Sequence, residues 1–340
     1  MSKGAVMPRR FVALLFGLVL TSGLGLPLTA HRAKADTPIE QLVAGVVRIT
    51  TSINPEGRTV GNLGAERSGT GIVIGSDGLV LTIGYLMVEA QTAEITLNDG
   101  RRVAAEIIGY DYDTGFGLLR ATSPLNVTVV ALGRSADLKA GDKVLVALGG
   151  GLDQVGPAHV ASKREFAGYW EYLLDEAIFT TPPYQDWSGA ALINREGRLV
   201  GVGSLVVNDA LGKGPGTPGN MFVPIDRLPP ILGELIAAGR VSGPAKPWLG
   251  LTTADSGGAL LVQRVTASGP AGKAGVKPGD RIVGVDQARA RTLAEFYRSI
   301  WALGEAGVVV PLTIERDGAK QRIDVTSVNR RRHLRLDSSL

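Results

Sequence analysis

The sequence has 340 residues, 44% of them hydrophobic and 20% charged, with no cysteine and three histidines. This length and composition predict two or three folded domains and exclude a disordered protein. The absence of cysteine excludes disulfides, thiol catalysis and thiolate-bound zinc, and we expect neither a cofactor nor a metal site.

The first 35 residues have the pattern of a secretory signal peptide. A basic start with Lys3, Arg9 and Arg10 precedes an apolar run, and Ala33-Lys34-Ala35 fits a small-x-small cleavage site. We expect export and cleavage there; an uncleaved segment would instead anchor the chain in a membrane. Cleavage would remove five basic residues and no acidic one, turning the formal charge of +4 into −1, with 31 basic and 32 acidic residues left. A nucleic-acid partner is therefore not expected.

Residues 42–225 have the pattern of short β segments joined by tight turns. The runs Gly71-Ile72-Val73-Ile74 and Leu79-Val80-Leu81-Thr82 flank the turn Ser76-Asp77-Gly78, and further Asp-Gly or Glu-Gly turns occur at 99–100 and 196–197. Because no long amphipathic helix intervenes, this pattern favours barrels or sandwiches over βαβ units.

The last third of the sequence is predicted to form a separate small domain. A helix is expected within 225–240, and the proline-rich stretch 242–247 is typical of a linker. Thr292-Leu293-Ala294-Glu295 is a capping box that predicts the start of an amphipathic helix. Strands are predicted at 308–314 and 321–325, around the Asp317-Gly318 turn.

A candidate nucleophile stands in the segment Asp186-Trp187-Ser188-Gly189-Ala190-Ala191-Leu192. A serine hydroxyl needs a base, normally a histidine oriented by a carboxylate, to take its proton. His31 precedes the predicted cleavage site, His333 is in the polar tail, and His159 is expected in a strand, satisfied locally. None of them is predicted to serve Ser188.

Taken together, these segments resemble the HtrA/Deg family of exported trypsin-like serine proteases, in which a two-barrel protease domain precedes PDZ domains. The resemblance rests on 68–74, 107–111, 186–192 and 221–226 in the first part, and on 248–251, 269–280 and the helix from Leu293 in the second. It implies a mainly β fold. The expected organisation is a signal peptide at 1–35, a chymotrypsin/trypsin-like double β-barrel at 36–228, a helical linker at 229–246, a PDZ domain at 247–328 and a solvated basic tail at 329–340.

The family's catalytic positions are not kept. The resemblance places Tyr85 at the position of the family's histidine and Gly115 at that of its aspartate, leaving Ser188 as a vestigial nucleophile. Asp186 replaces a glycine that supplies an oxyanion-hole amide, and a carboxylate there would repel the forming oxyanion. The alternative is that Lys163 or Asp113 lies close to Ser188 in an unexpected fold and acts as its base.

The PDZ-like part is predicted to bind peptides. Such domains add an extended C-terminal peptide to a sheet edge and hold its carboxylate with backbone amides of a glycine-containing loop. The resemblance assigns this loop to Trp248, Leu249, Gly250 and Leu251, and the facing helical wall to Phe296 and Ile300. The alternative is a PDZ fold used only for packing.

Two hypotheses follow. The first is a non-catalytic peptide-binding or regulatory protein of the periplasm, whose partners would be C-terminal or unfolded peptides and active HtrA relatives. The second is an active serine endopeptidase that uses Ser188 with an unrecognised base. The resemblance also suggests a trimer.

Overall fold

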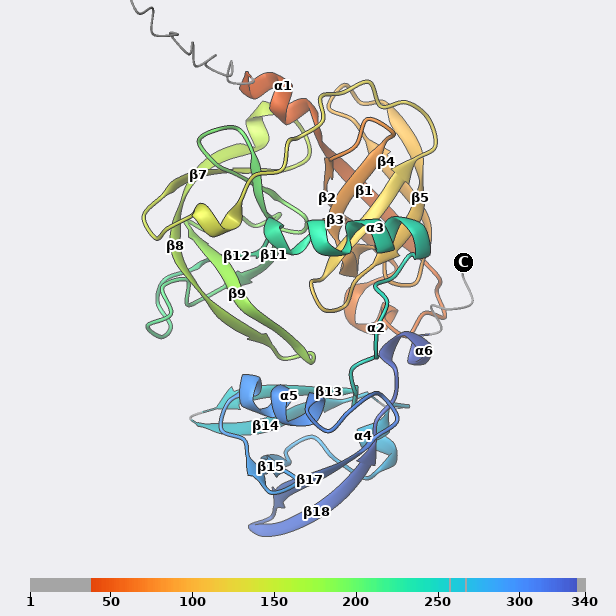
Figure 1. The fold of residues 1–340 in the computed structure, drawn as a ribbon, viewed down its shortest axis with the longest axis vertical. Coiled ribbons are helices and arrows are strands. Elements are labelled where there is room, and N and C mark those ends of the chain that lie inside the picture. Colours follow the sequence, from red (N-terminus) through yellow and green to blue (C-terminus); the bar gives the residue numbers. More distant parts are fainter. Residues whose placement is uncertain (1–37, 257, 267, 335–340) are drawn as a thin grey trace, which may run out of the picture. The chain divides into compact units, whose positions relative to one another are not determined.

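A computed structural model describes residues 38–256, 258–266 and 268–334, so the predicted signal peptide at 1–35 and His31 lie outside the described residues. The described chain forms two closed β-barrels and a further antiparallel sheet (Figure 1). The predicted mainly β fold is confirmed. In the described part of the chain, no helix is both long and apolar enough to cross a membrane.

The first barrel has six antiparallel strands in the order β1-β2-β3-β6-β5-β4. Its elements are α1 (Ile39–Ala44), β1 (Val46–Ile53), α2 (Val60–Leu63), β2 (Glu66–Val73), β3 (Leu79–Ile83), the 3-10 turn η1 (Gly84–Leu86), β4 (Ala90–Thr96), β5 (Arg102–Tyr110) and β6 (Phe116–Ala121). The predicted strand, turn and strand from 71 to 82 correspond to β2 and β3, which pair through Ile72 and Leu81. Gly71 leaves room for the Ile49 side chain of the neighbouring strand, because an added Cβ would lie 2.5 Å from Ile49 Cδ1.

The second barrel has the order β10-β11-β12-β9-β8-β7. Its elements are η2 (Ser135–Asp137), β7 (Lys143–Ala147), η3 (Leu152–Gln154), β8 (Val155–Gly168), β9 (Tyr172–Thr181), β10 (Ala191–Ile193), β11 (Leu199–Val207), β12 (Gly219–Pro224) and η4 (Ile225–Arg227). β8 and β9 are long strands that pair up to Gly168 and Tyr172, so they form a hairpin whose tip is 169–171.

A short helix follows the second barrel and packs against the first. α3 (Pro229–Ala238) begins with two prolines, which the first turn of a helix tolerates, and ends at Gly239 with φ +65°. It contacts β5, and the backbone N–H of Tyr110 donates to Gly239 O at 3.4 Å. Figure 1 shows α3 crossing the first barrel toward β5.

The last sheet has the order β13-β14-β15-β17-β18, with β16 paired to β15. Its elements are β13 (Leu251–Ser256), β14 (Ala259–Val265), α4 (Pro270–Lys273), β15 (Arg281–Val285), β16 (Ala288–Arg289), α5 (Leu293–Trp301), β17 (Val309–Arg316) and β18 (Ala319–Thr326). The predicted capping box is confirmed, since Thr292 Oγ1 accepts from Glu295 N and the Glu295 side chain accepts from Thr292 N. The amphipathic face of α5 then packs on the sheet through Phe296 and Ile300.

Residues 329–334 of the expected solvated basic tail are mostly half-buried. Asn329 caps the short helix α6 (Arg330–His333), and the Arg330 guanidinium lies 4.9 Å from the centroid of the Tyr112 ring. The His333 ring packs 4.6 Å from that of Trp248. Aromatic faces attract cations and planar rings, so the basic tail has favourable partners on the protein surface.

Candidate functional site

The loop that carries Ser188 is held by backbone contacts from both barrels. Ser188 O accepts a hydrogen bond of 2.8 Å from Thr70 N on β2. Gly189 has φ +75°, and an added Cβ there would lie 2.1 Å from Thr70 O. On the other side, an added Cβ at Gly203 of β11 would lie 2.2 Å from Trp187 O. Only glycine fits these two positions, which explains the glycine after the serine.

Tyr85 reaches the same place from the 3-10 turn η1, which directly follows β3. The buried guanidinium of Arg67 fixes this turn by donating to Tyr85 O at 2.7 Å and to Val88 O at 3.0 Å. Thr51 Oγ1 donates to Leu86 O on the adjacent residue. Gly84 is needed because an added Cβ would lie 1.9 Å from a Tyr110 ring carbon. Arg67 was not predicted as part of the site, because a basic residue beside Glu66 and Ser68 at the start of a strand gives no sign that its side chain is buried.

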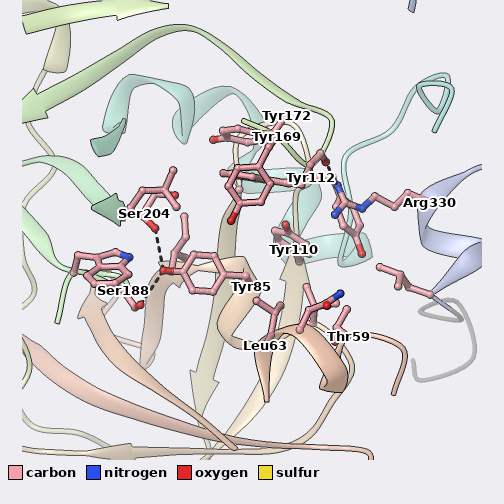
Figure 2. A pocket seen from close by; sticks show the side chains of 18 of the residues that line it. Thr59, Leu63, Tyr85, Tyr110, Tyr112, Tyr169, Tyr172, Ser188, Ser204 and Arg330 are labelled. Carbon is pink, nitrogen blue, oxygen red and sulfur yellow. Dashed lines mark hydrogen bonds between the residues drawn. The ribbon is translucent and has the colours of Figure 1, made fainter. Parts of the chain in front are cut away.

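The hydroxyl groups of Tyr85 and Ser188 are in hydrogen-bond contact, with 2.8 Å between their oxygens (Figure 2). Tyr85 Oη also lies 3.1 Å from Ser204 O, a carbonyl that can only accept. A phenol has one proton, so the arrangement that satisfies all three groups has Tyr85 donating to Ser204 O and Ser188 donating to Tyr85. In that arrangement the Ser188 proton points at a neutral phenol.

Burial raises the pKa of Tyr85 to about 12, against the opposing effect of the hydrogen bond with Ser188. The phenol therefore keeps its proton throughout the range in which proteins normally work. A neutral phenol is a very weak base, so Tyr85 cannot take the serine proton as an imidazole would.

Gly115, at the position the resemblance assigns to the aspartate, lines the same pocket as Tyr85 and Ser188. Its φ of +82° is unfavourable for a side chain, and an added Cβ would lie 3.4 Å from Tyr172 Oη. The nearby carboxylate of Asp111 is engaged instead with its own turn, accepting from Thr114 N at 2.8 Å and Thr114 Oγ1 at 2.7 Å. Burial raises the pKa of Asp111, opposed by these bonds.

The other candidate bases are engaged elsewhere. Lys163 Nζ donates to Ser135 O at 3.0 Å and pairs with Glu176, while Asp113 pairs with Lys246 at 3.0 Å. His159 is exposed on β8, opposite Lys143 and Thr181. No imidazole or carboxylate of the described residues lines the pocket that contains Ser188.

Asp186 does not reproduce the backbone shape of a glycine. It is exposed, and its φ is outside the left-handed region, whereas Gly189 three residues later is within it.

The pocket that contains Ser188 has a volume of about 500 Å³, and many of its lining residues are aromatic. Five of the seven tyrosines of the chain line it, together with two tryptophans: Tyr85, Tyr110, Tyr112, Tyr169, Tyr172, Trp170 and Trp187. Figure 2 shows Tyr110, Tyr112 and Tyr172 gathered on the side away from Ser188. Of these aromatic residues only Tyr85 was predicted at the site, because the seven come from four separate segments of the chain.

The loop predicted to bind a carboxylate does hold one. The backbone N–H groups of Leu249, Gly250 and Leu251 donate to the Glu171 carboxylate at 2.9, 2.8 and 3.0 Å, respectively. Gly250 has φ +80°, which turns the three amides toward one point. Glu171, from the hairpin tip, was not predicted, since nothing in the local sequence links it to a loop 78 residues away.

The apolar residues predicted to line the peptide groove form one buried cluster. Leu249, Leu251, Phe296 and Ile300 are each at most 3% exposed and pack together. Ala167 and Leu173, from the two strands of the hairpin, pack against this cluster. Trp248 lies outside it, between His333 and Arg330.

Comparison with known families defines the class of protein. Residues 69–202 match the trypsin-like peptidase domain, and residues 247–326 match the PDZ domain. The chain therefore combines a trypsin-like peptidase domain with a PDZ domain, in agreement with its resemblance to the HtrA/Deg family.

Individual relatives agree with this class. The chain is 31% identical over 279 residues to the periplasmic pH-dependent serine endoprotease DegQ of Escherichia coli, covering 77% of this chain and 59% of DegQ. It is 30% identical over 280 residues to a probable periplasmic serine endoprotease DegP-like of Pseudomonas putida, covering 77% and 56%. The serine protease PepD of Mycobacterium tuberculosis is 26% identical over 311 residues, covering 85% and 65%. The chain thus spans less than two thirds of the length of these relatives.

Solved structures share the fold. The HtrA-type protease AlgW with a decapeptide superposes with a TM-score of 0.51 at 19% identity, covering 86% of this chain and 97% of AlgW.

Proposed function

We propose that this chain is a catalytically inactive HtrA-type protein that acts by binding peptides through its PDZ domain. The observation that carries the proposed inactivity is the hydroxyl pair of Tyr85 and Ser188, in which a phenol of pKa about 12 stands where the resemblance expects the catalytic base.

The expected loss of turnover without a catalytic base is large enough to favour the inactive protein over the active endopeptidase. Removing members of a serine-protease triad lowers turnover on the order of a million-fold. Gly115 lacks a carboxylate and has a backbone that disfavours one, so the group that would orient a base is absent as well. An active endopeptidase would need Lys163 or Asp113 to leave an ion pair and approach Ser188.

Peptide binding is supported by what the PDZ loop offers. Three backbone amides converge on one carboxylate, beside a cluster of apolar side chains suited to a terminal apolar residue. The AlgW structure contains a decapeptide, which supports peptides as the ligand class. We propose that the ligands are free C-terminal or unfolded peptides of envelope proteins.

The site of action is proposed to be the periplasm. The relatives DegQ and DegP-like are named periplasmic, and the signal pattern at 1–35 supports export. Assembly as a trimer and association with active HtrA relatives are further proposals that rest on the family alone.

The test combines cleavage and binding on the chain from residue 36. Unfolded protein substrate should remain intact, and peptides with a free apolar C-terminus should bind with micromolar or weaker affinity, about 8 kcal/mol or less. Ile300→Asp should abolish binding by placing an unpaired charge among apolar side chains. The proposal is rejected if substrate is cleaved in a Ser188-dependent manner. It is also rejected if free-acid peptides bind neither this chain nor its Glu171→Gln variant, or if amidated peptides bind equally well.

A further inference from the structure

The PDZ loop is already occupied by a carboxylate from the same chain. Both oxygens of Glu171 contact the loop: Oε1 accepts from Gly250 N and Leu251 N, and Oε2 accepts from Leu249 N. A peptide's terminal carboxylate uses the same kind of donors, backbone amides of a glycine-containing loop. A side-chain carboxylate therefore satisfies the groups that would otherwise recognise a ligand.

The backbone of the hairpin also occupies the place of a peptide strand. Thr253 N on β13 donates to Tyr169 O at 3.0 Å. From the α5 side, Tyr297 Oη donates to Gly168 O at 2.7 Å and accepts from Glu171 N at 3.2 Å. The hairpin tip thus lies between β13 and α5, the two walls of the predicted groove.

Apolar and charged side chains complete the contact. Leu173 and Ala167 pack on the buried cluster that contains Phe296 and Ile300. Arg298 on α5 pairs with Glu165 and Asp175, which flank the hairpin tip on β8 and β9. Arg330 donates to Trp170 O at 3.3 Å. Strand β13, helix α5 and the tail residue Arg330 therefore all contact the tip of the β8–β9 hairpin or the residues beside it.

The backbone conformation of Glu171 is unfavourable for a glutamate, so contacts outside the turn must stabilise it. Glu171 has φ +59°, the left-handed conformation that usually ends a three-residue hairpin loop with glycine or asparagine. A glutamate at this position costs roughly 1 to 2 kcal/mol. Such strain persists when surrounding contacts fix it, here the three amides of the PDZ loop.

We propose that the tip of the β8–β9 hairpin is an internal ligand of the PDZ domain. The Glu171 carboxylate takes the position of a peptide's C-terminal carboxylate, and a free-acid peptide binds only when it displaces the hairpin. This inference rests on the proposed peptide-binding function. It predicts that the wild-type chain binds peptides more weakly than an open groove would. The apparent affinity equals that of the open groove multiplied by the fraction of molecules in which the hairpin is released.

The first test measures peptide affinity on the chain from residue 36. The probe is a fluorescent peptide with a free C-terminal valine, compared with its amide. Glu171→Gln keeps the shape of the side chain but removes its charge, and Tyr297→Phe removes the hydroxyl that contacts the hairpin. Each should raise affinity for the free acid at least about tenfold, because less of the groove's binding energy is spent on displacing the hairpin. Glu176→Gln on β9, which removes a charge that pairs with Lys163 instead, should leave affinity unchanged.

The second test needs no peptide. Hydrogen exchange at the amides of Leu249, Gly250 and Leu251 should be slow in the wild-type chain and at least about tenfold faster in Glu171→Gln, while Glu176→Gln resembles wild type.

The two tests separate failure of this inference from failure of the proposed function. Equal affinity and equal exchange in wild type and Glu171→Gln overturn the internal ligand, even where peptides bind. Faster exchange in Glu171→Gln without any peptide binding supports the internal contact and rejects the proposed function.

Discussion

At the scale of single residues, one hydroxyl decides what Ser188 can do. Near neutral pH an imidazole has a free lone pair that can accept a proton. The Tyr85 phenol instead donates a hydrogen bond to Ser204 O, and its oxygen accepts one from the Ser188 hydroxyl. Both hydroxyls are thereby satisfied without any charge. The pair is a structural hydrogen bond between the two barrels, because Tyr85 comes from η1 and Ser188 from the loop before β10.

Tyr85→Phe should therefore reduce stability, not activity. It leaves Ser204 O and Ser188 Oγ without their partner, and the free energy of unfolding should fall by about 1 to 2 kcal/mol. Tyr169→Phe is the matched control, since its side chain is half exposed and should change stability by less than about 0.5 kcal/mol. Thermal denaturation of both variants checks this. An unchanged melting temperature for Tyr85→Phe would show that the hydroxyl pair contributes nothing.

At the scale of elements, the loop that carries Ser188 packs between β2 and β11. Close backbone contacts on both sides leave no space for a side chain at Gly189 or Gly203. These close contacts join the loop to both barrels, so the loop contributes to the packing between them.

Gly189→Ala should consequently be far more damaging than a similar change elsewhere. Both Gly189 and Gly100 have positive φ, but an added Cβ at Gly100 meets nothing within 4 Å. Gly100→Ala should cost about 1 to 2 kcal/mol from strain alone, and Gly189→Ala at least about 2 kcal/mol more from the clash with Thr70 O. Chemical denaturation of the two variants gives the comparison. Equal losses would mean that the loop is free to move away from β2.

The local parts of these elements could be predicted from sequence. The turn at 76–78 and the capping box at Thr292 are short-range patterns, and the structure has both. The contact of Glu171 with the PDZ loop and the collection of tyrosines around Ser188 could not be predicted, because they join segments far apart in the chain. The packing of residues 329–334 could not be predicted either, because the aromatic partners of Arg330, Tyr112 and Trp248, lie far from it in the sequence.

At the scale of the whole molecule, the tail links the first and last parts of the chain. His333 packs on Trp248, and its ring nitrogens lie 3.0 Å from a guanidinium nitrogen of Arg58, beside α2. Burial, followed by the charges of Arg58 and Lys273, lowers the pKa of His333 to about 4. The ring is therefore neutral when packed, and Arg58 donates to it.

This contact should weaken in acid. The unfolded chain takes up a proton near the ordinary histidine pKa of about 6.5, whereas the folded chain resists until about pH 4. The stability contributed by the neutral ring is thus complete above pH 6.5 and is lost as the pH falls toward 4. The difference in the free energy of unfolding between wild type and His333→Asn should therefore change between pH 6.5 and 4. His159→Asn, at an exposed position, is the control. A pH-independent difference for His333→Asn would contradict the assignment.

The most direct test of the account is whether Ser188 is an activated nucleophile. The chain from residue 36 is incubated with a fluorophosphonate probe at pH 7 to 9, next to its Ser188→Ala variant and to the relative DegQ as a positive control. We predict labelling of DegQ and none of this chain, because a phenol of pKa about 12 cannot take the serine proton. Labelling of the wild-type chain that disappears in Ser188→Ala would contradict the central claim and establish a serine hydrolase with an unrecognised base.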